Sequence, residues 1–395
     1  MRILIPTHFP LEGSGSGIYV ANLAAELLAA GHFPHVIAPD HAPIRGRGFP
    51  CTTILCAGGG APLPDLPFNF PCFTTHPRSA NTFYDLTDEQ VDVYVQTLRN
   101  AINRAVRDFQ PDLIHAQHLW VAAVCAAETA LPFVVTSHGT DLIGLRKDPR
   151  FRPMVQKAVG RVGRIIAVSS QVARDIKALL PVPDRKIVVI GNGFDPAIFH
   201  PNGLDRESVL RRVGIEEPRR HIVTFVGKLT HFKGADVLIH AAAHYEPRVD
   251  SVLTLIVGDG ELRSELGDLV RRHTAQGIRF LGHRPQSDVA DLMRIANVHA
   301  MPSRGEPFGI AALEALACGT PVVGTRAGGL PDFITPEVGS LAEVDNPIAL
   351  ANLIVRELKS GSKRTKGPAA ARYALDGFTW ERQVAKIAVV YEQVV

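Results

Sequence analysis

The sequence lacks the features that mark several large classes of protein. It has no run of eighteen apolar residues, which is the length that a membrane-spanning helix needs. The apolar run at residues 2–6 is shorter than the core of a secretory signal peptide. The formal net charge is only +3 for 395 residues, whereas nucleic-acid-binding proteins normally carry a larger and clustered positive charge. We therefore expect a cytoplasmic protein that contacts no nucleic acid.

Cysteine and metal-binding patterns are also scarce. The chain has five cysteines, an odd number, and no Cys-x-x-Cys pair. Cys125 and Cys318 lie in apolar helical stretches, so the pattern predicts buried thiols in a reducing compartment. No Asp-x-Asp pair occurs, and the closest approach to one is Asp259-Gly260-Glu261. We expect no metal site and no cofactor.

What the sequence does contain is enough apolar residues for two domains. A chain of 395 residues with 46% hydrophobic content exceeds one typical core. Short β-rich runs alternate with helical patterns, which predicts parallel strands covered by helices in a doubly wound sheet. The expected strands are 3–6, 35–39, 113–116, 133–137, 165–168, 187–190, 222–226, 252–257, 278–281, 298–301 and 321–324. The expected helices are 17–30, 88–108, 120–130, 170–180, 234–243, 261–274, 287–296, 310–318 and 380–394.

The alternation is interrupted once, by a stretch rich in proline and arginine at 196–220. We therefore predict two Rossmann-like domains, 1–195 and 196–378. A loose polar stretch, 360–367, precedes the last helix. Because open α/β sheets bind ligands beyond the carboxyl ends of their strands, two such domains predict a ligand site in a cleft between them.

Two glutamates eight positions apart, Glu306 and Glu314, flank a turn that opens an apolar helix. Pro307 and Gly309 supply the turn, and 310–318 is the helix, so free backbone N–H groups face outward between two carboxylates. Such a helix start attracts an anion, while the carboxylates accept hydrogen bonds from hydroxyls. This pattern fits a ligand with both phosphate and sugar. The alternative is an ordinary surface helix with unrelated carboxylates.

Glycine and lysine recur where a phosphate could bind. Residues 13–17, Gly-Ser-Gly-Ser-Gly, follow the first strand and open a helix, so their backbone can approach a phosphate closely. Asp40, at the end of the second strand, would also suit a nicotinamide enzyme, although the G-x-G-x-x-G spacing is missing. Lys228 and Lys233 stand at the head of the second domain and could neutralise a diphosphate. Alternatively, both are surface lysines that take no part in ligand binding.

His138 ends an apolar strand, and Gly139 behind it allows the backbone to turn toward a ligand. The alternative is a core or capping histidine. Asp141, three residues on, is equally well explained as an Asx-type cap for the next turn.

The order of these residues is specific to one family. The segment after residue 302 carries Ser303, Glu306, Phe308, Gly309, Glu314, Gly319, Thr320, Pro321, Gly328 and Gly329. It resembles the donor-sugar signature of the family-4 retaining glycosyltransferases, which have the two-domain GT-B fold. Further matches lie at Gly15-Ser16-Gly17, Gly31-His32, His138-Gly139-Thr140-Asp141, 192–195, Gly227-Lys228, Lys233-Gly234, 258–261 and Trp380. In this family the last helix, here 379–395, packs back on the first domain.

The resemblance implies a role for each matching residue. The leaving diphosphate is lined by Gly15, Gly17, Lys228 and Lys233, although the family usually has arginine where Lys228 stands. His138 and Glu306, with Lys233, form the expected catalytic group, and the backbone of Phe308, Gly309 and Ile310 holds the sugar. Glu314 takes the ribose hydroxyls, and the turns at Gly258 and Arg284 flank the base and ribose. The implied reaction is metal-independent and retains the anomeric configuration.

Two segments fall outside the resemblance. His76, Arg78 and Tyr84 lie with several phenylalanines in a Pro-rich loop of some forty residues. Because long loops beside a site tend to be functional, we expect them to bind the acceptor; alternatively, the aromatic residues pack the loop onto the first domain. A basic stretch at 146–164 is either a solvated helix face or attracts an anionic acceptor or lipid surface.

The sequence therefore predicts a glycosyltransferase that uses a nucleotide diphosphate sugar and a small-molecule or glycan acceptor. UDP is favoured because the Gly-Ser-Gly and His-Gly-Thr-Asp motifs resemble those of enzymes that use UDP-N-acetylglucosamine; UDP-glucose is the other candidate. The alternatives are a GT-B phosphorylase, a nucleotide-sugar epimerase and a non-catalytic sugar-nucleotide sensor.

Overall fold

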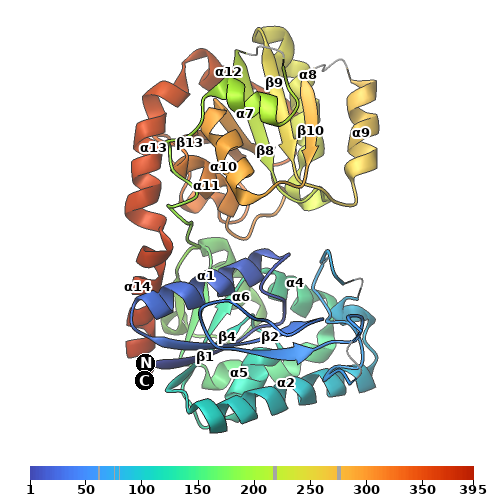
Figure 1. The fold of residues 1–395 in the computed structure, drawn as a ribbon, viewed down its shortest axis with the longest axis vertical. Coiled ribbons are helices and arrows are strands. Elements are labelled where there is room, and N and C mark those ends of the chain that lie inside the picture. Colours follow the sequence, from blue (N-terminus) through green and yellow to red (C-terminus); the bar gives the residue numbers. More distant parts are fainter. Residues whose placement is uncertain (61–62, 75, 80, 217–219, 274–276) are drawn as a thin grey trace. The chain divides into compact units, whose positions relative to one another are not determined.

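The computed structural model describes residues 1–60, 63–74, 76–79, 81–216, 220–273 and 277–395. The chain divides into two compact units. Unit 1 comprises Met1–Asn192 together with Trp380–Val395, and unit 2 comprises Gly193–Thr379. Each unit has one parallel sheet covered by helices (Figure 1), which confirms the prediction of doubly wound α/β domains.

The sheet of unit 1 has seven parallel strands in the order β3-β2-β1-β4-β5-β6-β7. The order reverses between β1 and β4, and such a switch point is where open α/β sheets bind ligands. The strands are apolar and mostly buried because helices cover both faces of the sheet. They are β1 (Arg2–Pro6), β2 (Phe33–Asp40), β3 (Cys51–Leu55), β4 (Leu113–Gln117), β5 (Phe133–Ser137), β6 (Arg164–Ala167) and β7 (Ile187–Val189).

Side-chain caps start several helices of unit 1. The hydroxyl of Ser14 accepts a hydrogen bond from the Gly17 amide at the start of α1, and Thr87 and Gln90 form a capping box at the start of α2. Both patterns are readable in the sequence. The helices are α1 (Gly15–Ala29), α2 (Asp88–Phe109), α3 (Val121–Glu128), α4 (Thr140–Lys147), α5 (Arg152–Arg161), α6 (Ser170–Leu179) and α14 (Trp380–Glu392).

The C-terminal helix α14 belongs to the core of unit 1. Trp380 packs edge-on against Tyr19 of α1, with ring centroids 5.1 Å apart. The Tyr391 hydroxyl lies 2.6 Å from Nδ1 of His115, a buried residue of β4. Aromatic burial and this hydrogen bond hold α14 in place although Trp380 follows Asn192, the preceding residue of the unit, by 188 positions.

The sheet of unit 2 has six parallel strands in the order β10-β9-β8-β11-β12-β13, with its switch point between β8 and β11. The strands are β8 (His221–Val226), β9 (Val252–Val257), β10 (Ile278–Gly282), β11 (Val298–Met301), β12 (Val322–Thr325) and β13 (Gly339–Ala342). The helices are α7 (Arg206–Arg212), α8 (Ala235–Tyr245), α9 (Arg263–Arg272), α10 (Gln286–Ile295), α11 (Ile310–Ala317), α12 (Pro347–Lys359) and α13 (Ser362–Phe378).

Two expectations about loops are wrong. Most of the polar stretch 360–367 belongs to α13, which runs through Pro368. Glycine and proline argue against a helix here, but Gly367 packs against the backbone of Gly319 next to α11, where an added Cβ would lie 2.6 Å from the Gly319 carbonyl. The long loop after β2 is also interrupted, because β3 pairs in parallel with β2 at the edge of the sheet.

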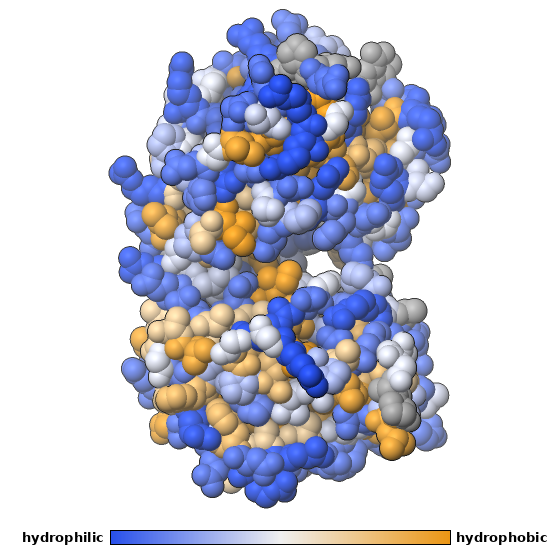
Figure 2. Space-filling view, viewed as in Figure 1, coloured by the Kyte–Doolittle hydropathy of each residue, from blue (hydrophilic) through white to orange (hydrophobic). Residues whose placement is uncertain are grey.

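Part of the surface of unit 1 is apolar. Figure 2 shows apolar side chains gathered over α1, where Ile18 and Leu28 are exposed. Within the described residues, no helix combines the length and apolar character needed to cross a membrane.

Candidate functional site

The loop that follows β11 is tightly held. The Thr325 hydroxyl, from the neighbouring strand β12, donates a hydrogen bond to the Ser303 carbonyl at 2.5 Å. Arg304 forms a two-pronged contact with Asp236 of α8, at 2.9 and 2.6 Å, and its Nε donates to Asp345 at 2.6 Å. These contacts preorganise the segment that carries Glu306.

Glu306 and Lys233 form an ion pair at the switch point of unit 2. Lys233 Nζ lies 2.5 Å from Glu306 Oε2, and the glutamate side chain is 7% exposed while that of the lysine is 28% exposed. The Ser303 hydroxyl is 3.4 Å from the same oxygen. The ion pair places a carboxylate and an ammonium group side by side at the ends of β11 and β8, with the ammonium still reachable by solvent.

Glycines bring the backbone of this loop close to its neighbours. The Glu306 carbonyl accepts a hydrogen bond from the Gly329 amide at 2.8 Å. A Cβ on Gly328, which has φ +56°, would lie 1.7 Å from that carbonyl. A Cβ on Gly234 would lie 2.1 Å from the Pro302 carbonyl. Only glycine fits these positions, so part of the glycine pattern is needed for packing alone.

Helices α8 and α11 both begin without a side-chain cap. Their N-cap residues are Gly234 and Gly309, with φ of +68° and +109°, and a glycine supplies no side-chain cap. Phe308 is buried and stacks on Phe333 with ring centroids 5.0 Å apart, which positions the turn. Ile310, the first residue of α11, is partly exposed. The first N–H groups of α11 are available to an anion, whereas at the start of α8 the Asp236 carboxylate already accepts from the Asp236 and Val237 amides.

Glu314 lies on α11, one turn after its start, and is partly exposed. Among the described residues its carboxyl group has no hydrogen bond or ion pair. Burial in apolar surroundings raises the pKa of Glu314 to about 8. The group is therefore mostly protonated at neutral pH, and it can both donate and accept a hydrogen bond.

The remaining predicted donor residues lie at neighbouring strand ends. Lys228 follows β8 and is partly exposed, and Gly258 follows β9 with φ +128°. A Cβ on Gly258 would lie 2.0 Å from the Gly227 carbonyl, so this glycine brings the ends of β8 and β9 together. Arg284 follows β10, and its Nε donates to the Leu281 carbonyl at 3.1 Å.

In unit 1 the two glycines that open α1 differ. The Gly17 amide donates to the Ser14 hydroxyl at 3.0 Å, and a Cβ on Gly17 would lie 2.1 Å from the Pro10 carbonyl. The amide of Gly17 is thus used within the protein and its missing side chain is explained by packing. Gly15 is exposed, and a Cβ there would meet nothing within 4 Å. Of the two, Gly15 presents its backbone to solvent.

His138 follows β5 and is largely buried, with 9% exposure. Its Nε2 lies 3.0 Å from Oε1 of Gln117, the last residue of β4. The rings of Tyr19 and His118 pack against it at 4.8 and 4.7 Å. Burial lowers the pKa of His138 to about 3, so the imidazole is neutral at physiological pH.

Asp141 lies in the first turn of α4 and also holds the neighbouring loop. It is fully buried, and its Oδ2 accepts a hydrogen bond from the Leu119 amide at 2.7 Å. It thereby fixes the loop after β4, in which His118 has a left-handed φ of +70°. Burial also raises the pKa of Asp141.

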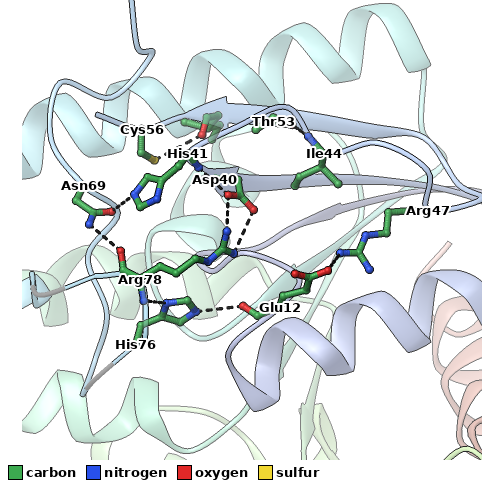
Figure 3. Close-up of polar contacts among 11 residues, drawn as sticks. Glu12, Asp40, His41, Ile44, Arg47, Thr53, Cys56, Asn69, His76 and Arg78 are labelled. Atoms are coloured by element: carbon green, nitrogen blue, oxygen red, sulfur yellow. Dashed lines mark hydrogen bonds and ion pairs between the residues drawn. The ribbon is translucent and has the colours of Figure 1, made fainter. Parts of the chain in front are cut away.

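The predicted acceptor residues are held by contacts within unit 1, as Figure 3 shows for His76 and Arg78. His76 is buried, and its Nε2 lies 3.2 Å from the Glu12 carbonyl. The Arg78 guanidinium contacts both carboxylate oxygens of Asp40, at 2.8 and 3.3 Å. The Tyr84 hydroxyl is sealed from solvent without a hydrogen-bond partner, so it would have to move to contact an acceptor.

Other side chains of these two segments have structural roles. Phe70 and Phe73 are buried, and Phe73 packs against Trp120 at 5.0 Å, so aromatic residues do pack this loop onto unit 1. In the basic stretch, Arg146 pairs with Asp175, and Arg150 pairs with Asp148 and Asp88. Two of the seven basic residues of the stretch are therefore paired with carboxylates within the unit.

Sequence reasoning missed Gln117 and the pairing of Arg78 with Asp40. Gln117 was readable as a polar residue at the end of an apolar strand, beside the switch point. Asp40 had been considered only as a partner for a ribose. Its contact with a residue 38 positions away has no local signal in the sequence.

Comparisons with known proteins all point to glycosyltransferases. A family model for "Glycosyltransferase Family 4" matches residues 13–198, and one for "Glycosyl transferases group 1" matches residues 207–372. Two D-inositol 3-phosphate glycosyltransferases, from Salinispora tropica and Salinispora arenicola, are each 32% identical to this chain. The matches cover 72% and 75% of this chain and 64% and 72% of those proteins. An N-acetyl-alpha-D-glucosaminyl L-malate synthase from Bacillus anthracis is 27% identical over 79% of this chain and 84% of its own.

Solved structures show the same fold. Sucrose-phosphate synthase from Thermosynechococcus elongatus superposes with a TM-score of 0.78 at 21% identity, covering 100% of this chain and 98% of its own. Anabaena Alr3699/HepE, solved in complex with UDP and glucose, superposes with a TM-score of 0.71 at 22% identity, covering 99% of each chain. These similarities confirm the fold class predicted from the sequence.

Proposed function

Because this chain belongs to glycosyltransferase family 4 and has the GT-B fold, we propose that it transfers a sugar from a UDP-sugar to an acceptor hydroxyl, with retention and without a metal ion. The observation that carries the proposal is the Lys233–Glu306 ion pair beside the uncapped start of α11. It combines a cation for phosphate, a carboxylate for sugar hydroxyls and free N–H groups in one loop. UDP is favoured because Alr3699/HepE was solved with UDP and glucose.

The donor diphosphate would be held by charge and by backbone N–H groups. Lys228 and Lys233 lie at the end of β8, and α11 begins without a cap. Each charge-assisted hydrogen bond to a phosphate contributes about 1.5–3 kcal/mol. Two lysines with the start of α11 can therefore stabilise the departing nucleotide without a metal. Gly15 of unit 1 is proposed to add a further N–H group.

The two glutamates would recognise the two ends of the donor. Glu306 already pairs with Lys233, so a sugar hydroxyl that donates to Glu306 would share the carboxylate with the lysine. Glu314 has a pKa of about 8 and no hydrogen bond among the described residues, so its carboxyl group can bind ribose hydroxyls as donor and acceptor. His138 would contact the sugar, and Gly258 and Arg284 would flank the base and ribose.

Catalysis by this site would rest on several electrostatic contacts together. Enzymes lower barriers by about 8–23 kcal/mol, whereas one preorganised hydrogen-bond donor supplies about 3 kcal/mol. No single residue of the site is sufficient. We therefore expect no obligatory covalent intermediate, and the charge on the leaving phosphate would be met by Lys228, Lys233 and the start of α11.

The acceptor is proposed to be a small polar molecule with a hydroxyl group. Two relatives are named for inositol 3-phosphate and malate, which are both small and polar. In unit 1 the Arg78–Asp40 pair presents N–H donors next to carboxylate oxygens, and the Arg78 side chain is 37% exposed. A hydroxyl can donate to the carboxylate and accept from the guanidinium. His76 supports this pair, since its Nδ1 accepts a hydrogen bond from the Arg78 amide at 3.1 Å.

The substitution Glu306→Gln tests the proposal. It keeps the shape of the side chain and removes the charge, so sugar transfer should fall by about 10²–10³-fold while UDP binding is retained. Glu343→Gln, at an exposed glutamate of the same unit, is the matched control and should leave transfer unchanged. Equal loss of transfer and UDP binding in Glu306→Gln would contradict the role given to Glu306.

Thermal unfolding with UDP, GDP or ADP identifies the base. A nucleotide at 100 times its dissociation constant adds about 2.7 kcal/mol to the free energy of unfolding, so UDP should raise Tm most. Turnover is then measured by release of UDP with and without candidate acceptors. Release that requires inorganic phosphate would indicate a phosphorylase, and UDP binding without release under any condition would indicate a sensor.

A further inference from the structure

Gln117 lies between two neighbouring strands at the switch point of unit 1. It ends β4 and is fully buried. Its side-chain Nε2 lies 3.4 Å from the His115 carbonyl, and its Oε1 lies 3.0 Å from Nε2 of His138. A carbonyl can only accept, so the amide nitrogen must face His115 and the amide oxygen must face His138. The opposite orientation would place two oxygens against each other.

This orientation determines which nitrogen of His138 carries the proton. The Gln117 oxygen has no hydrogen to donate, so Nε2 of His138 must be the donor. A neutral imidazole has one N–H group, and its other nitrogen then carries a lone pair. Nδ1 of His138 is therefore a hydrogen-bond acceptor.

The groups around His138 carry no charge that would favour its protonated form. The Tyr19 ring packs edge-on from α1, and burial raises its pKa to about 12. His115 of β4 and His118 of the following loop are buried, and burial lowers the pKa of His115 to about 3 and that of His118 well below its usual value. Burial likewise keeps His138 neutral. The tautomer is thus set by the hydrogen bond to Gln117.

Nδ1 of His138 is open to a ligand. It has no hydrogen-bond partner among the described residues, and the side chain keeps 9% exposure. Both ring nitrogens of the adjacent His118, in contrast, are sealed from solvent and have no hydrogen-bond partner within the described part of the chain. Of these two neighbouring rings, His138 is the one that can receive a hydrogen bond from outside.

We infer that Gln117 is a positioning residue that holds His138 as the Nε2–H tautomer, so that Nδ1 accepts a hydrogen bond from a sugar hydroxyl or amide N–H of the substrate. This ligand assignment rests on the proposed function, whereas the tautomer does not. A phosphate oxygen would face the lone pair and be repelled, so His138 discriminates for a ligand group that carries a hydrogen. A sugar lacking that hydroxyl loses this contact.

The tautomer is measured directly by ¹⁵N NMR of the histidine-labelled full-length chain, with His138→Asn used to assign the signal. In the wild type, Nε2 of His138 should be protonated and Nδ1 bare. In Gln117→Leu the two tautomers should exchange, and Gln96→Leu, on the exposed face of α2, should leave the signal unchanged. A protonated Nδ1 in the wild type would overturn the inference.

Kinetics separate positioning from a purely structural role. Gln117→Leu should lower kcat/KM for the donor by about tenfold at every pH, the effect of one lost hydrogen bond. In Gln117→Glu the carboxylate still accepts from Nε2, but its charge raises the pKa of His138 and so protonates Nδ1 at low pH. Transfer by Gln117→Glu should therefore recover as pH rises through that pKa, while Gln117→Leu does not recover. A loss of equal size in both variants, without pH dependence, would show that Gln117 serves packing alone.

The two proposals can fail separately. A wild-type chain that shows the expected tautomer but transfers no sugar would contradict the proposed function and leave the role of Gln117 in setting the tautomer intact.

Discussion

The two units share a parallel doubly wound sheet but line their switch points with different chemistry. In unit 1, neutral buried histidines follow β1, β4 and β5, namely His8, His118 and His138. In unit 2 the corresponding loop carries ion pairs, Lys233 with Glu306 and Arg304 with Asp236. A fold alone thus determines where a ligand binds, whereas the side chains at the strand ends determine what charge the ligand carries.

The difference follows from the cost of burying charge. Moving a protonated imidazole out of water costs more free energy than moving a neutral one. A buried histidine therefore stays neutral. The His8 ring accordingly contacts the Tyr94 hydroxyl at 2.7 Å and the Ala122 amide at 3.2 Å instead of a carboxylate. Lys233, by contrast, keeps 28% exposure and contacts the Glu306 carboxylate.

The largest expected effect is that acid unfolds unit 1 before unit 2. The folded-state pKa values of His8, His115 and His138 are about 3, below the unfolded value of 6.5. Below pH 6.5 the unfolded state therefore binds more protons, and stability falls by about 1.4 kcal/mol per histidine and pH unit. Asp141 has the opposite effect on the stability of unit 1. Its pKa is raised in the folded state, so as pH falls the folded state takes up this proton before the unfolded state does.

Unit 2 should respond at lower pH. Of its buried histidines, His299 has a pKa of about 3, and the lowered pKa values of Asp236 and Glu357 make their contribution disappear only below the ordinary carboxylate range. Both tryptophans, Trp120 and Trp380, lie in unit 1, so tryptophan emission reports on unit 1 while far-UV circular dichroism reports on both units. Coincident transitions by the two methods would contradict this comparison.

The second effect concerns glycines with unequal surroundings. Gly328→Ala should destabilise the protein by about 2–4 kcal/mol, because the added carbon would lie 1.7 Å from the Glu306 carbonyl and φ is positive. Gly15→Ala has space within 4 Å and should change stability by about 0.5 kcal/mol or less. Urea unfolding of both variants measures the difference, and equal destabilisation would remove the distinction.

The third expected effect is a loss of stability of unit 2 as pH rises. The folded-state pKa of Glu314 is about 8, above the ordinary value of 4.5, so the folded state holds the extra proton between these pH values. Stability should fall as pH rises from 4.5 to 8, because the unfolded state ionises first. Between pH 5 and pH 9, Glu314→Gln should gain on the wild type by up to about 4 kcal/mol in free energy of unfolding, with the gap closing toward pH 5. A gap that does not depend on pH would contradict the raised pKa.

The smallest effect concerns the acceptor side. Arg78→Ala should raise the acceptor KM by a few-fold with the donor KM unchanged, since one hydrogen-bonded contact contributes about 0.5–1.5 kcal/mol. Stability should change by about 1 kcal/mol or less, as for other partly exposed ion pairs. Arg107→Ala, at an exposed arginine of the same unit, is the control. An increase in donor KM alone would move Arg78 out of the acceptor role.

Local sequence patterns determined where several strands and helices begin and end. Mainly apolar runs predicted β5, β9 and β11 with their observed bounds, because a fully buried parallel strand needs such a run. The glycine and proline around Glu306 likewise predicted the start of α11. The residue types at the strand ends were sufficient to indicate the family and the class of ligand.

Only the tertiary structure determined which side chains contact each other and which buried side chains are charged. Helix α13 forms through Pro368 because Gly367 packs on Gly319, and Lys233 meets Glu306 across 73 positions of sequence. Neither contact has a local signal, since each depends on which strands become neighbours in the sheet. The same holds for pKa values: a sequence shows that a histidine or glutamate is present, but only burial determines that His138 is neutral and that Glu314 keeps its proton.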